Sequence, residues 1–213
     1  MRVIAIPVKS LARAKRRLAP RLTPLERGAL TLAMFEDVLD ATTAVPGWQT
    51  WVISPDEVVL EIAARRGVRP VPEAKPPLTS AVRQTEVMAR EEEADALAIV
   101  PGDLPLATTG ALTKALRTLG PVVLVRSSGD GTNLLLRRPP RSIPSRFGPD
   151  SFRRHLALAQ ARGLPASVVE QPELSFDVDV PSDILTVLGA GRRGRTREVC
   201  LEMDLGERLK MYA

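Results

Sequence analysis

The segment Ala96-Leu97-Ala98-Ile99-Val100-Pro101-Gly102-Asp103 indicates the fold class, because a short apolar run ends abruptly at a turn and a carboxylate. Five consecutive apolar residues are typical of a strand that is buried on both faces, as in a parallel sheet. A carboxylate just beyond such a strand lies where open α/β sheets bind their ligands. Taken alone, Asp103 would equally suit a turn in which the side chain bonds its own backbone.

Similar apolar runs flank this segment and alternate with helical patterns. Thr23-Pro24-Leu25-Glu26 predicts a helix start with a capping box and a proline in the first turn. Strands are expected at residues 3–6, 50–53, 68–71, 122–126, 134–138 and 167–169, and helices at 58–66, 78–90, 151–161, from 181 and 197–211. This alternation predicts an α/β fold with a mainly parallel twisted sheet flanked by helices.

The length of 213 residues predicts one sizeable domain, which we place at residues 1–188, followed by a basic linker and helix over residues 189–213. No apolar run approaches the roughly 20 residues that cross a bilayer, so no membrane partner is expected. The single cysteine, Cys200, excludes an internal disulfide and a zinc site of paired thiolates. These features favour a cytoplasmic protein, and a homo-oligomer stays open.

The net charge of +5 and the pI near 10 raise the alternative of a non-catalytic nucleic-acid-binding protein. Aromatic residues make up 3% of the chain, which disfavours single-strand binding by base stacking. The cations are also dispersed rather than gathered in one long run. We therefore expect no nucleic acid as partner and a small anionic substrate instead.

A second acidic motif, Phe176-Asp177-Val178-Asp179, is expected to end a strand. Residues two apart on a strand share a face, so Asp177 and Asp179 would project together. Like charges this close cost free energy unless a cation offsets them, and magnesium prefers carboxylates combined with substrate phosphates. Together with Asp103 they predict a Mg²⁺ site that carries a triphosphate, although Asp179 would also suit a simple helix start.

Two further segments predict anion binding. Residues 7–18 follow the first strand, lack the glycines of a phosphate loop, and supply four candidate cations besides Arg16, which suits a solvated helix surface. These are Lys9, Arg13, Lys15 and Arg17. The second segment joins Gly129-Asp130-Gly131-Thr132-Asn133 to a helix start at Gly148 and Ser151, where backbone N–H groups favour an anion. His155, the only histidine, is expected to pack or face solvent rather than to catalyse.

In the order and spacing of its motifs, the chain resembles the guanylyltransferases of coenzyme F420 biosynthesis, which use 2-phospho-L-lactate or phosphoenolpyruvate. The resemblance covers about residues 1–188. The motifs that carry it are Ile6-Pro7-Val8-Lys9, Ala14-Lys15-Arg16-Arg17-Leu18-Ala19, Glu36-Asp37-Val38-Leu39, Pro101-Gly102-Asp103-Leu104-Pro105, Gly131-Thr132-Asn133, Arg146-Phe147-Gly148-Pro149 and Asp177-Val178-Asp179-Val180-Pro181 with Asp183.

The resemblance implies a single-domain nucleotidyltransferase fold of the GT-A type that binds GTP and Mg²⁺. It implies metal ligation by Asp103, Asp177 and Asp179, with Lys9, Lys15 and Asp103 catalytic. It further implies acceptor binding by Thr132, Gly148 and Ser151, and nucleotide binding by Lys9, Arg13, Lys15 and Ser80. The chain departs from the family at Pro77-Leu78-Thr79-Ser80, at Ser127-Ser128-Gly129-Asp130 and at Asp150, which stands where glycine is usual.

The predicted reaction transfers GMP from GTP to phosphoenolpyruvate or 2-phospho-L-lactate. The acceptor phosphate attacks the α-phosphorus and expels pyrophosphate. A phosphate monoester is already a nucleophile near neutral pH, so alignment and charge neutralisation would supply the catalysis. A nucleotidyltransferase of the same fold with a sugar-phosphate or molybdopterin acceptor remains the main alternative.

Overall fold

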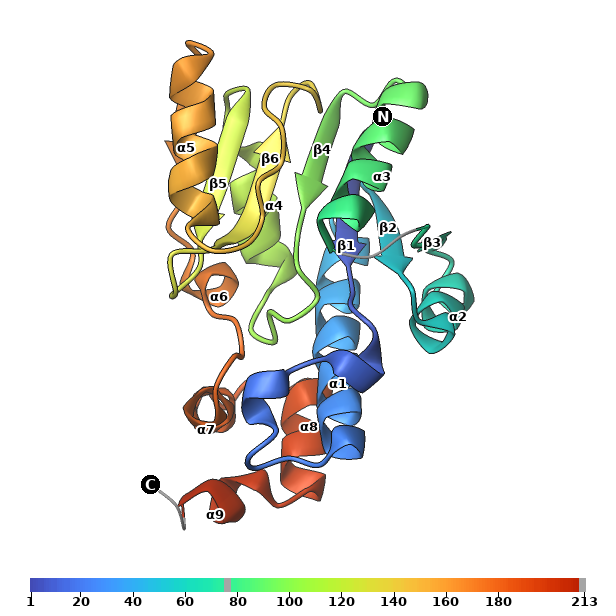
Figure 1. Cartoon of the computed structure of the whole chain (residues 1–213), viewed down its shortest axis with the longest axis vertical. Coiled ribbons are helices and arrows are strands. Elements are labelled where there is room, and N and C mark those ends of the chain that lie inside the picture. Colours follow the sequence, from blue (N-terminus) through green and yellow to red (C-terminus); the bar gives the residue numbers. More distant parts are fainter. Residues whose placement is uncertain (75–77, 211–213) are drawn as a thin grey trace.

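A central sheet organises the protein in a computed structural model that describes residues 1–74 and 78–210, without the side chains of residues 78 and 79. Its strand order is β3-β2-β1-β4-β6-β5-β7 (Figure 1). The strands are β1 (Arg2–Pro7), β2 (Gln49–Ser54), β3 (Arg69–Pro72), β4 (Ala96–Ile99), β5 (Val122–Arg126), β6 (Thr132–Arg137) and β7 (Ala166–Val168). Among these strands only β6 pairs antiparallel with its neighbours, so the prediction of a mainly parallel sheet is confirmed.

The helices include those predicted after Thr23, at residues 58–66, 78–90 and 151–161 and from residue 181, together with four that were not predicted, at residues 11–13, 16–18, 109–117 and 172–175. They are η1 (Leu11–Arg13), η2 (Arg16–Leu18), α1 (Pro24–Thr43), α2 (Glu57–Arg65), α3 (Leu78–Glu91), α4 (Thr109–Arg117), α5 (Ser151–Ala161), α6 (Pro172–Ser175), α7 (Pro181–Gly189), α8 (Arg195–Glu202) and α9 (Leu205–Lys210). The capping box is confirmed, because Thr23 Oγ1 accepts from Glu26 N at 3.3 Å and Glu26 Oε2 accepts from Thr23 N at 2.7 Å. No described helix combines the length and apolarity that a membrane span requires.

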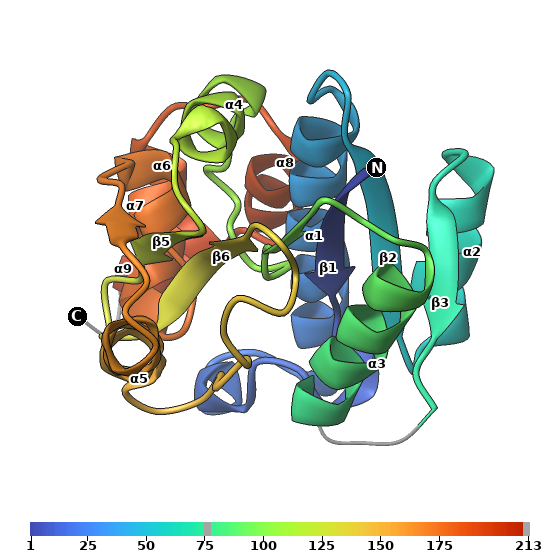
Figure 2. The ribbon, with the colours of Figure 1, turned by 90° about the horizontal axis from the view of Figure 1, so that it is seen from above.

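Both faces of the sheet are covered, which explains the nearly continuous apolar strands. Ile4 and Ile6 of β1 belong to the core shared with α1, α2, α4 and α6. Val3 and Ala5 belong to the core shared with α3, and α5 covers the neighbouring strands on that same side. Figure 2 shows α3 and α5 on one side of the sheet and α1 and α4 on the other.

Two predicted elements were wrong in detail. Residues 176–179 form no strand, but an extended segment between α6 and α7, because the short helix α6 already turns the chain away from β7. The helix predicted at residues 197–211 is divided into α8 and α9, with Asp204 between them at a φ of 52°. Residue 211 lies outside the described residues.

The C-terminal helices pack against the beginning of the chain through a third apolar cluster. α8 and α9 lie below the sheet in Figure 1, where α8 runs beside α1. The cluster's buried members are Leu18, Leu22, Leu30, Met34, Val178, Ile184, Val187, Cys200, Leu205 and Leu209. Residues on both sides of position 188 therefore share one core, while the predicted domain boundary at that position stays a prediction.

Candidate active site

Charged side chains from three segments meet at the carboxyl edge of the sheet. β1 and β4 pair in parallel, so the segments that follow them leave the sheet at the same edge. There Lys15 Nζ lies 2.7 Å from Asp103 Oδ2 and 3.5 Å from Asp179 Oδ1. Arg17 Nη1 lies 3.0 Å from Asp179 Oδ2. We call Lys15, Arg17, Asp103, Asp177 and Asp179 the ionic cluster.

Lys15 reaches this position because the loop after β1 is fixed at several points. The Leu11 backbone N–H donates to Asp56 Oδ2 at 3.0 Å, and Arg27 Nε donates to the Ala14 carbonyl at 3.4 Å. Lys15 itself has the left-handed conformation, with φ 49° and ψ 46°, between η1 and η2. Such a conformation costs a non-glycine residue on the order of 1 kcal/mol, which the surrounding contacts must offset.

Asp103 is placed by the glycine that precedes it. A Cβ at Gly102 would lie 3.1 Å from Val8 Cγ2 and 3.4 Å from Ile6 Cγ2, so a larger residue would require these side chains to move by a few tenths of an ångström. The Asp103 carbonyl accepts from the Val178 backbone N–H at 3.4 Å. This bond ties the segment after β4 to the segment that carries the acidic pair.

Asp177 and Asp179 point away from the core although the segment that carries them is not part of a strand. Val178 is fully buried, so the extended segment turns Asp177 and Asp179 away from the core on either side of it. Asp177 Oδ1 accepts from Asn133 Nδ2 at 3.3 Å, while Asp179 contacts the two cations. Asp103, Asp177 and Asp179 thus surround Lys15, although no strand aligns them.

The cluster carries unbalanced negative charge. Burial raises the pKa of Asp177, the charges of Asp103 and Asp179 raise it further, and the Asn133 hydrogen bond and Lys15 only partly oppose them. Burial by itself lowers the pKa of Lys15, but Asp103, through its charge and hydrogen bond, together with the charges of Asp179 and Asp177, raises it above its ordinary value. Lys15 is therefore held charged among carboxylates.

A divalent cation suits these donors. The carboxylate oxygens are hard ligands, and a positive ion would relieve the repulsion that raises the pKa of Asp177. Among the described residues, no three His, Cys, Asp or Glu side chains are grouped as a ready-made metal site. Magnesium commonly takes one or two carboxylates with substrate phosphates, so the donors fit a cation that arrives with a nucleotide.

A second, neutral group of side chains lies at the same edge of the sheet, where β6 begins opposite the end of β4. Ser151 Oγ lies 3.2 Å from Thr132 Oγ1, and Thr132 Oγ1 lies 3.0 Å from His155 Nδ1. All three side chains are buried. We call Thr132, Ser151 and His155 the hydroxyl cluster. Thr132 and Asn133 are consecutive on β6, so their side chains leave opposite faces of the strand, Thr132 towards α5 and Asn133 towards α6 and Asp177.

The loop before α5 turns sharply around this cluster. Gly148 has a φ of 117°, and its carbonyl accepts from the Ser151 N–H at 3.1 Å. Asp150 has the left-handed φ of 53°, which glycine adopts at lower cost, and its exposed side chain makes no capping bond. Gly131 is also required, because a Cβ there would lie 2.7 Å from Ser127 Oγ.

The structure brings most predicted site residues together but not all. Lys9 and Arg13 are exposed on the loop after β1, and Ser80 lies half-buried in α3. In the part of the chain that is described, no hydrogen bond or ion pair links these three residues to either cluster. Pro77 lies outside the described residues, as do the side chains of Leu78 and Thr79.

Sequence reasoning did not assign two members of the site. Asn133, which was named only as part of the segment predicted to bind an anion, donates to Asp177 Oδ1 and to the Ser175 carbonyl at 3.3 and 3.1 Å. His155 is buried, as one alternative expected, but it also bonds Thr132. Its position four residues after Ser151 on α5 is the signal that could have paired them.

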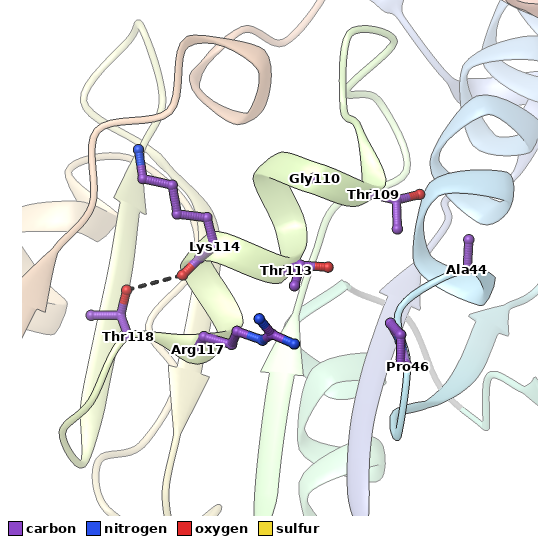
Figure 3. A pocket seen from close by; sticks show the side chains of 8 residues that line it. All are labelled: Ala44, Pro46, Thr109, Gly110, Thr113, Lys114, Arg117 and Thr118. Atoms are coloured by element: carbon purple, nitrogen blue, oxygen red, sulfur yellow. Dashed lines mark hydrogen bonds between the residues drawn. The ribbon is translucent and has the colours of Figure 1, made fainter.

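A separate depression lies between the end of α1 and α4 (Figure 3). Its volume is about 720 Å³, and it is lined by Ala44, Pro46, Thr109, Gly110, Thr113, Lys114, Arg117 and Thr118. None of the predicted site residues lines it, and its charged side chains are all basic. The chemistry expected of the aspartates therefore does not belong to this depression.

Comparison with known proteins agrees with this geometry. The family described as "Guanylyl transferase CofC like" matches residues 1–208. The chain belongs to this CofC-like family. The match extends beyond residue 188 and includes α8 and most of α9. The protein is accordingly a nucleotidyltransferase, and its predicted fold class is confirmed.

Named relatives of this CofC-like protein differ in the acceptor that their names give. The phosphoenolpyruvate guanylyltransferase of Rubrobacter xylanophilus is 37% identical over 87% of this chain and 93% of its own. The 3-phospho-D-glycerate guanylyltransferase of Phenylobacterium zucineum is 35% identical over 89% and 91%. The 2-phospho-L-lactate guanylyltransferase of Methanothermobacter thermautotrophicus is 35% identical over 91% and 86%.

A crystal structure from Desulfovibrio desulfuricans G20 has the same fold. It superposes with a TM-score of 0.83 at 16% identity and covers 100% of this chain and 99% of its own. At this identity the likeness extends to the fold alone.

Proposed function

We propose that this CofC-like protein transfers GMP from GTP to the phosphate of a small phosphorylated acid and releases pyrophosphate. The acceptor would be phosphoenolpyruvate or 2-phospho-L-lactate, and the product would enter coenzyme F420 biosynthesis in the cytoplasm. The observation that carries the proposal is the junction at Thr132 and Asn133. One of these neighbours bonds the hydroxyl cluster and the other bonds Asp177.

In this proposal the ionic cluster receives the triphosphate. Lys15 and Arg17 neutralise negative charge that builds on the leaving pyrophosphate, and the exposed Lys9 and Arg13 lie on the same loop. A phosphate oxygen of the acceptor attacks the α-phosphorus, and the bond to the β-phosphate oxygen breaks. Because the acceptor is already anionic near neutral pH, the residues need only align it and offset charge.

Magnesium would be held by Asp103 and by Asp177, Asp179 or both. Bound there with a triphosphate, it would supply neutralisation of the phosphate charge. Lys15 Nζ bonds Oδ2 of the Asp103 carboxylate, which would also hold the metal, so the two cations would compete for this carboxylate. We expect Lys15 to turn towards the phosphates when metal and nucleotide bind together.

The hydroxyl cluster would receive the acceptor acid. Ser151 and the backbone around Gly148 lie at the start of α5, where N–H groups and the helix dipole favour an anion, and Thr132 of β6 contacts Ser151 there. Phosphoenolpyruvate and 2-phospho-L-lactate differ little in shape, and 3-phospho-D-glycerate must be included because one relative carries that name. An activity assay with each of the three acids therefore decides which one is the acceptor.

The deciding experiment is mass spectrometry of products formed from GTP and Mg²⁺ with each of the three phosphoacids in turn. We expect one guanylylated acid and an equal amount of pyrophosphate. Replacing GTP by ATP or CTP tests the selectivity for guanine. Asp103→Asn should reduce the rate of pyrophosphate release roughly 100- to 1000-fold, the usual loss when a principal electrostatic contact is removed.

Asp40→Asn is the matched control for Asp103→Asn, because Asp40 is an exposed acidic residue on α1 whose side chain bonds the surface Arg66. The control should retain the wild-type rate. The proposal is wrong if no phosphoacid yields a guanylylated product, or if Asp103→Asn releases pyrophosphate as fast as the control.

A further inference from the structure

The two nitrogens of the buried His155 have fixed and different roles. Nε2 accepts a hydrogen bond from the Arg146 backbone N–H at 2.9 Å. A backbone N–H can only donate, so Nε2 carries no proton. The proton of a neutral imidazole then lies on Nδ1, which faces Thr132 Oγ1 at 3.0 Å. His155 therefore donates to Thr132, and Thr132 cannot donate to His155.

This direction decides what the two hydroxyl groups can offer a ligand. Thr132 and Ser151 have two hydroxyl protons between them, and their oxygens lie 3.2 Å apart. One proton forms the bond within the pair, and Thr132 receives a further bond from His155. One hydroxyl proton is left over, and it is free to bond a ligand. With the opposite tautomer, Thr132 would donate to His155, Ser151 would donate to Thr132, and no proton would remain.

We propose that His155 is a positioning residue which makes the Thr132–Ser151 pair present one O–H donor to the anionic acceptor. The inference rests on the proposed acceptor site. An anion bound against two hydroxyl oxygens without a donor would meet only lone pairs. With the His155 tautomer set by the Arg146 N–H, the same pair stabilises the anion through a charge-assisted hydrogen bond.

The surroundings keep this arrangement unchanged near neutral pH. Burial lowers the pKa of His155 to about 4, the charges of Arg137 and Arg146 lower it further, and that of Glu86 raises it. A protonated ring would also direct an Nε2–H at the Arg146 N–H. The Phe147 ring packs edge-on against the imidazole, with 5.3 Å between centroids and 71° between planes, which fixes the ring orientation.

The tautomer can be measured directly, because His155 is the only histidine of the chain. We would label the full-length protein with ¹⁵N-histidine and record the two ring-nitrogen shifts at pH 7 and through an acid titration. The expected spectrum has a protonated Nδ1 and a bare Nε2 that persist to about pH 5. A protonated Nε2 at pH 7, in the neutral or the charged ring, overturns the inference.

The consequence for binding is tested by kinetics with His155→Leu and His155→Asn. Loss of a hydrogen bond to a charged ligand should raise the KM for the acceptor roughly tenfold to a hundredfold in His155→Leu, with an unchanged KM for GTP. In His155→Asn the amide nitrogen can take the place of Nδ1 and donate to Thr132. This variant should keep an acceptor KM within about threefold of the wild type.

A double-mutant cycle separates this role from simple packing. In a Thr132→Val background, His155→Leu should cause no further rise in the acceptor KM, because His155 acts through the missing hydroxyl. Effects that multiply instead would assign His155 a packing role and overturn the inference. If Thr132→Val alone leaves the acceptor KM unchanged, the proposed acceptor site is wrong, whereas the NMR result still decides the tautomer.

Discussion

The ionic cluster and the hydroxyl cluster lie at the same edge of the sheet but use opposite chemistry. In the ionic cluster, charged side chains are partly open to solvent, with Asp103 33% and Asp179 48% exposed. In the hydroxyl cluster, Thr132, Ser151 and His155 are neutral and at most 4% exposed. In the proposed function the chain would therefore hold one anion by adjustable charge and the other by fixed dipoles.

This difference indicates which of the two clusters we expect to rearrange when ligands bind. In the proposed function Lys15 competes with a metal for Asp103, so we expect the ionic cluster to rearrange when nucleotide binds. The hydroxyl cluster is already oriented by bonds to α5 and to the Arg146 backbone, so it needs no rearrangement. Charge-balanced contacts are also screened by salt, whereas buried hydrogen bonds are not. Four predictions test this contrast, from the largest expected effect to the smallest.

Lys15→Met should affect activity most. Removing the ammonium from among three carboxylates should lower kcat/KM at least roughly 100-fold and, by removing a competing cation, tighten metal binding in the absence of nucleotide. Pyrophosphate release measures the first effect, and titration with Mn²⁺ followed by electron paramagnetic resonance measures the second. Weaker Mn²⁺ binding in Lys15→Met would show that Lys15 organises the aspartates for the metal rather than competing with it.

His155 should make the stability of the protein depend on pH. Its pKa is about 4 in the folded chain and near 6.5 when unfolded, so the unfolded chain takes up the proton first as the pH falls. The free energy of unfolding should therefore fall by about 3 kcal/mol between pH 7 and pH 4 on account of this residue. Urea denaturation at several pH values measures it, with His155→Asn as control. Parallel pH curves for the two proteins would contradict the prediction.

Asp177→Asn should stabilise the protein while it lowers activity. The pKa of Asp177 is raised in the folded protein. At pH values above the ordinary aspartate pKa, its ionised form therefore lowers the free energy of unfolding. The amide keeps an oxygen that accepts from Asn133 and removes the repulsion. We expect a gain of roughly 0.5 to 1 kcal/mol at pH 7, which thermal unfolding can detect. The gain should vanish as the pH falls below about 3.8, the ordinary pKa of an aspartate. A loss of stability at pH 7 would mean that neighbouring residues stabilise the ionised carboxylate of Asp177.

Arg17→Ala should have the smallest effect on stability. Arg17 and Asp179 form an exposed pair, with 73% and 48% of their side chains open to solvent. Such pairs contribute less than about 0.5 kcal/mol, and salt weakens them further. A loss above about 1 kcal/mol in chemical denaturation would show that even the outer part of the ionic cluster is structural. The KM for GTP, in contrast, should rise measurably and more at low ionic strength.

Much of the fold was predictable because the sheet is buried on both faces. Runs such as residues 96–100 then read as uniformly apolar strands, and the capping box at Thr23 marks its helix through local chemistry alone. The segment at residues 176–179 was misread because alternating apolar and acidic residues suit any extended chain beside a core. Whether such a segment pairs into a sheet depends on the tertiary position of α6, which periodicity does not encode.

The site residues were predictable to the extent that their chemistry follows from residue type. Carboxylates after strands and cations after β1 carry recognisable signals, and the structure brings Lys15 to Asp103 and Asp179. Asn133 and His155 were not assigned because their roles depend on partners far along the chain. The Asn133 amide bonds residues 42 and 44 positions away, and no local pattern marks such a contact.

The tail after residue 188 bears on how this enzyme can be shortened or fused. Leu18 adjoins Arg17, and Val178 separates the two acidic residues. Leu18 and Val178 belong to the same buried apolar cluster as Leu205 and the other apolar side chains of α8 and α9. Asp37 anchors that tail by accepting from the Arg195 and Thr196 backbone N–H groups at 2.8 and 3.0 Å. A chain cut after residue 188 would keep every candidate site residue and yet lose the apolar side chains of α8 and α9 that pack with the segments carrying them.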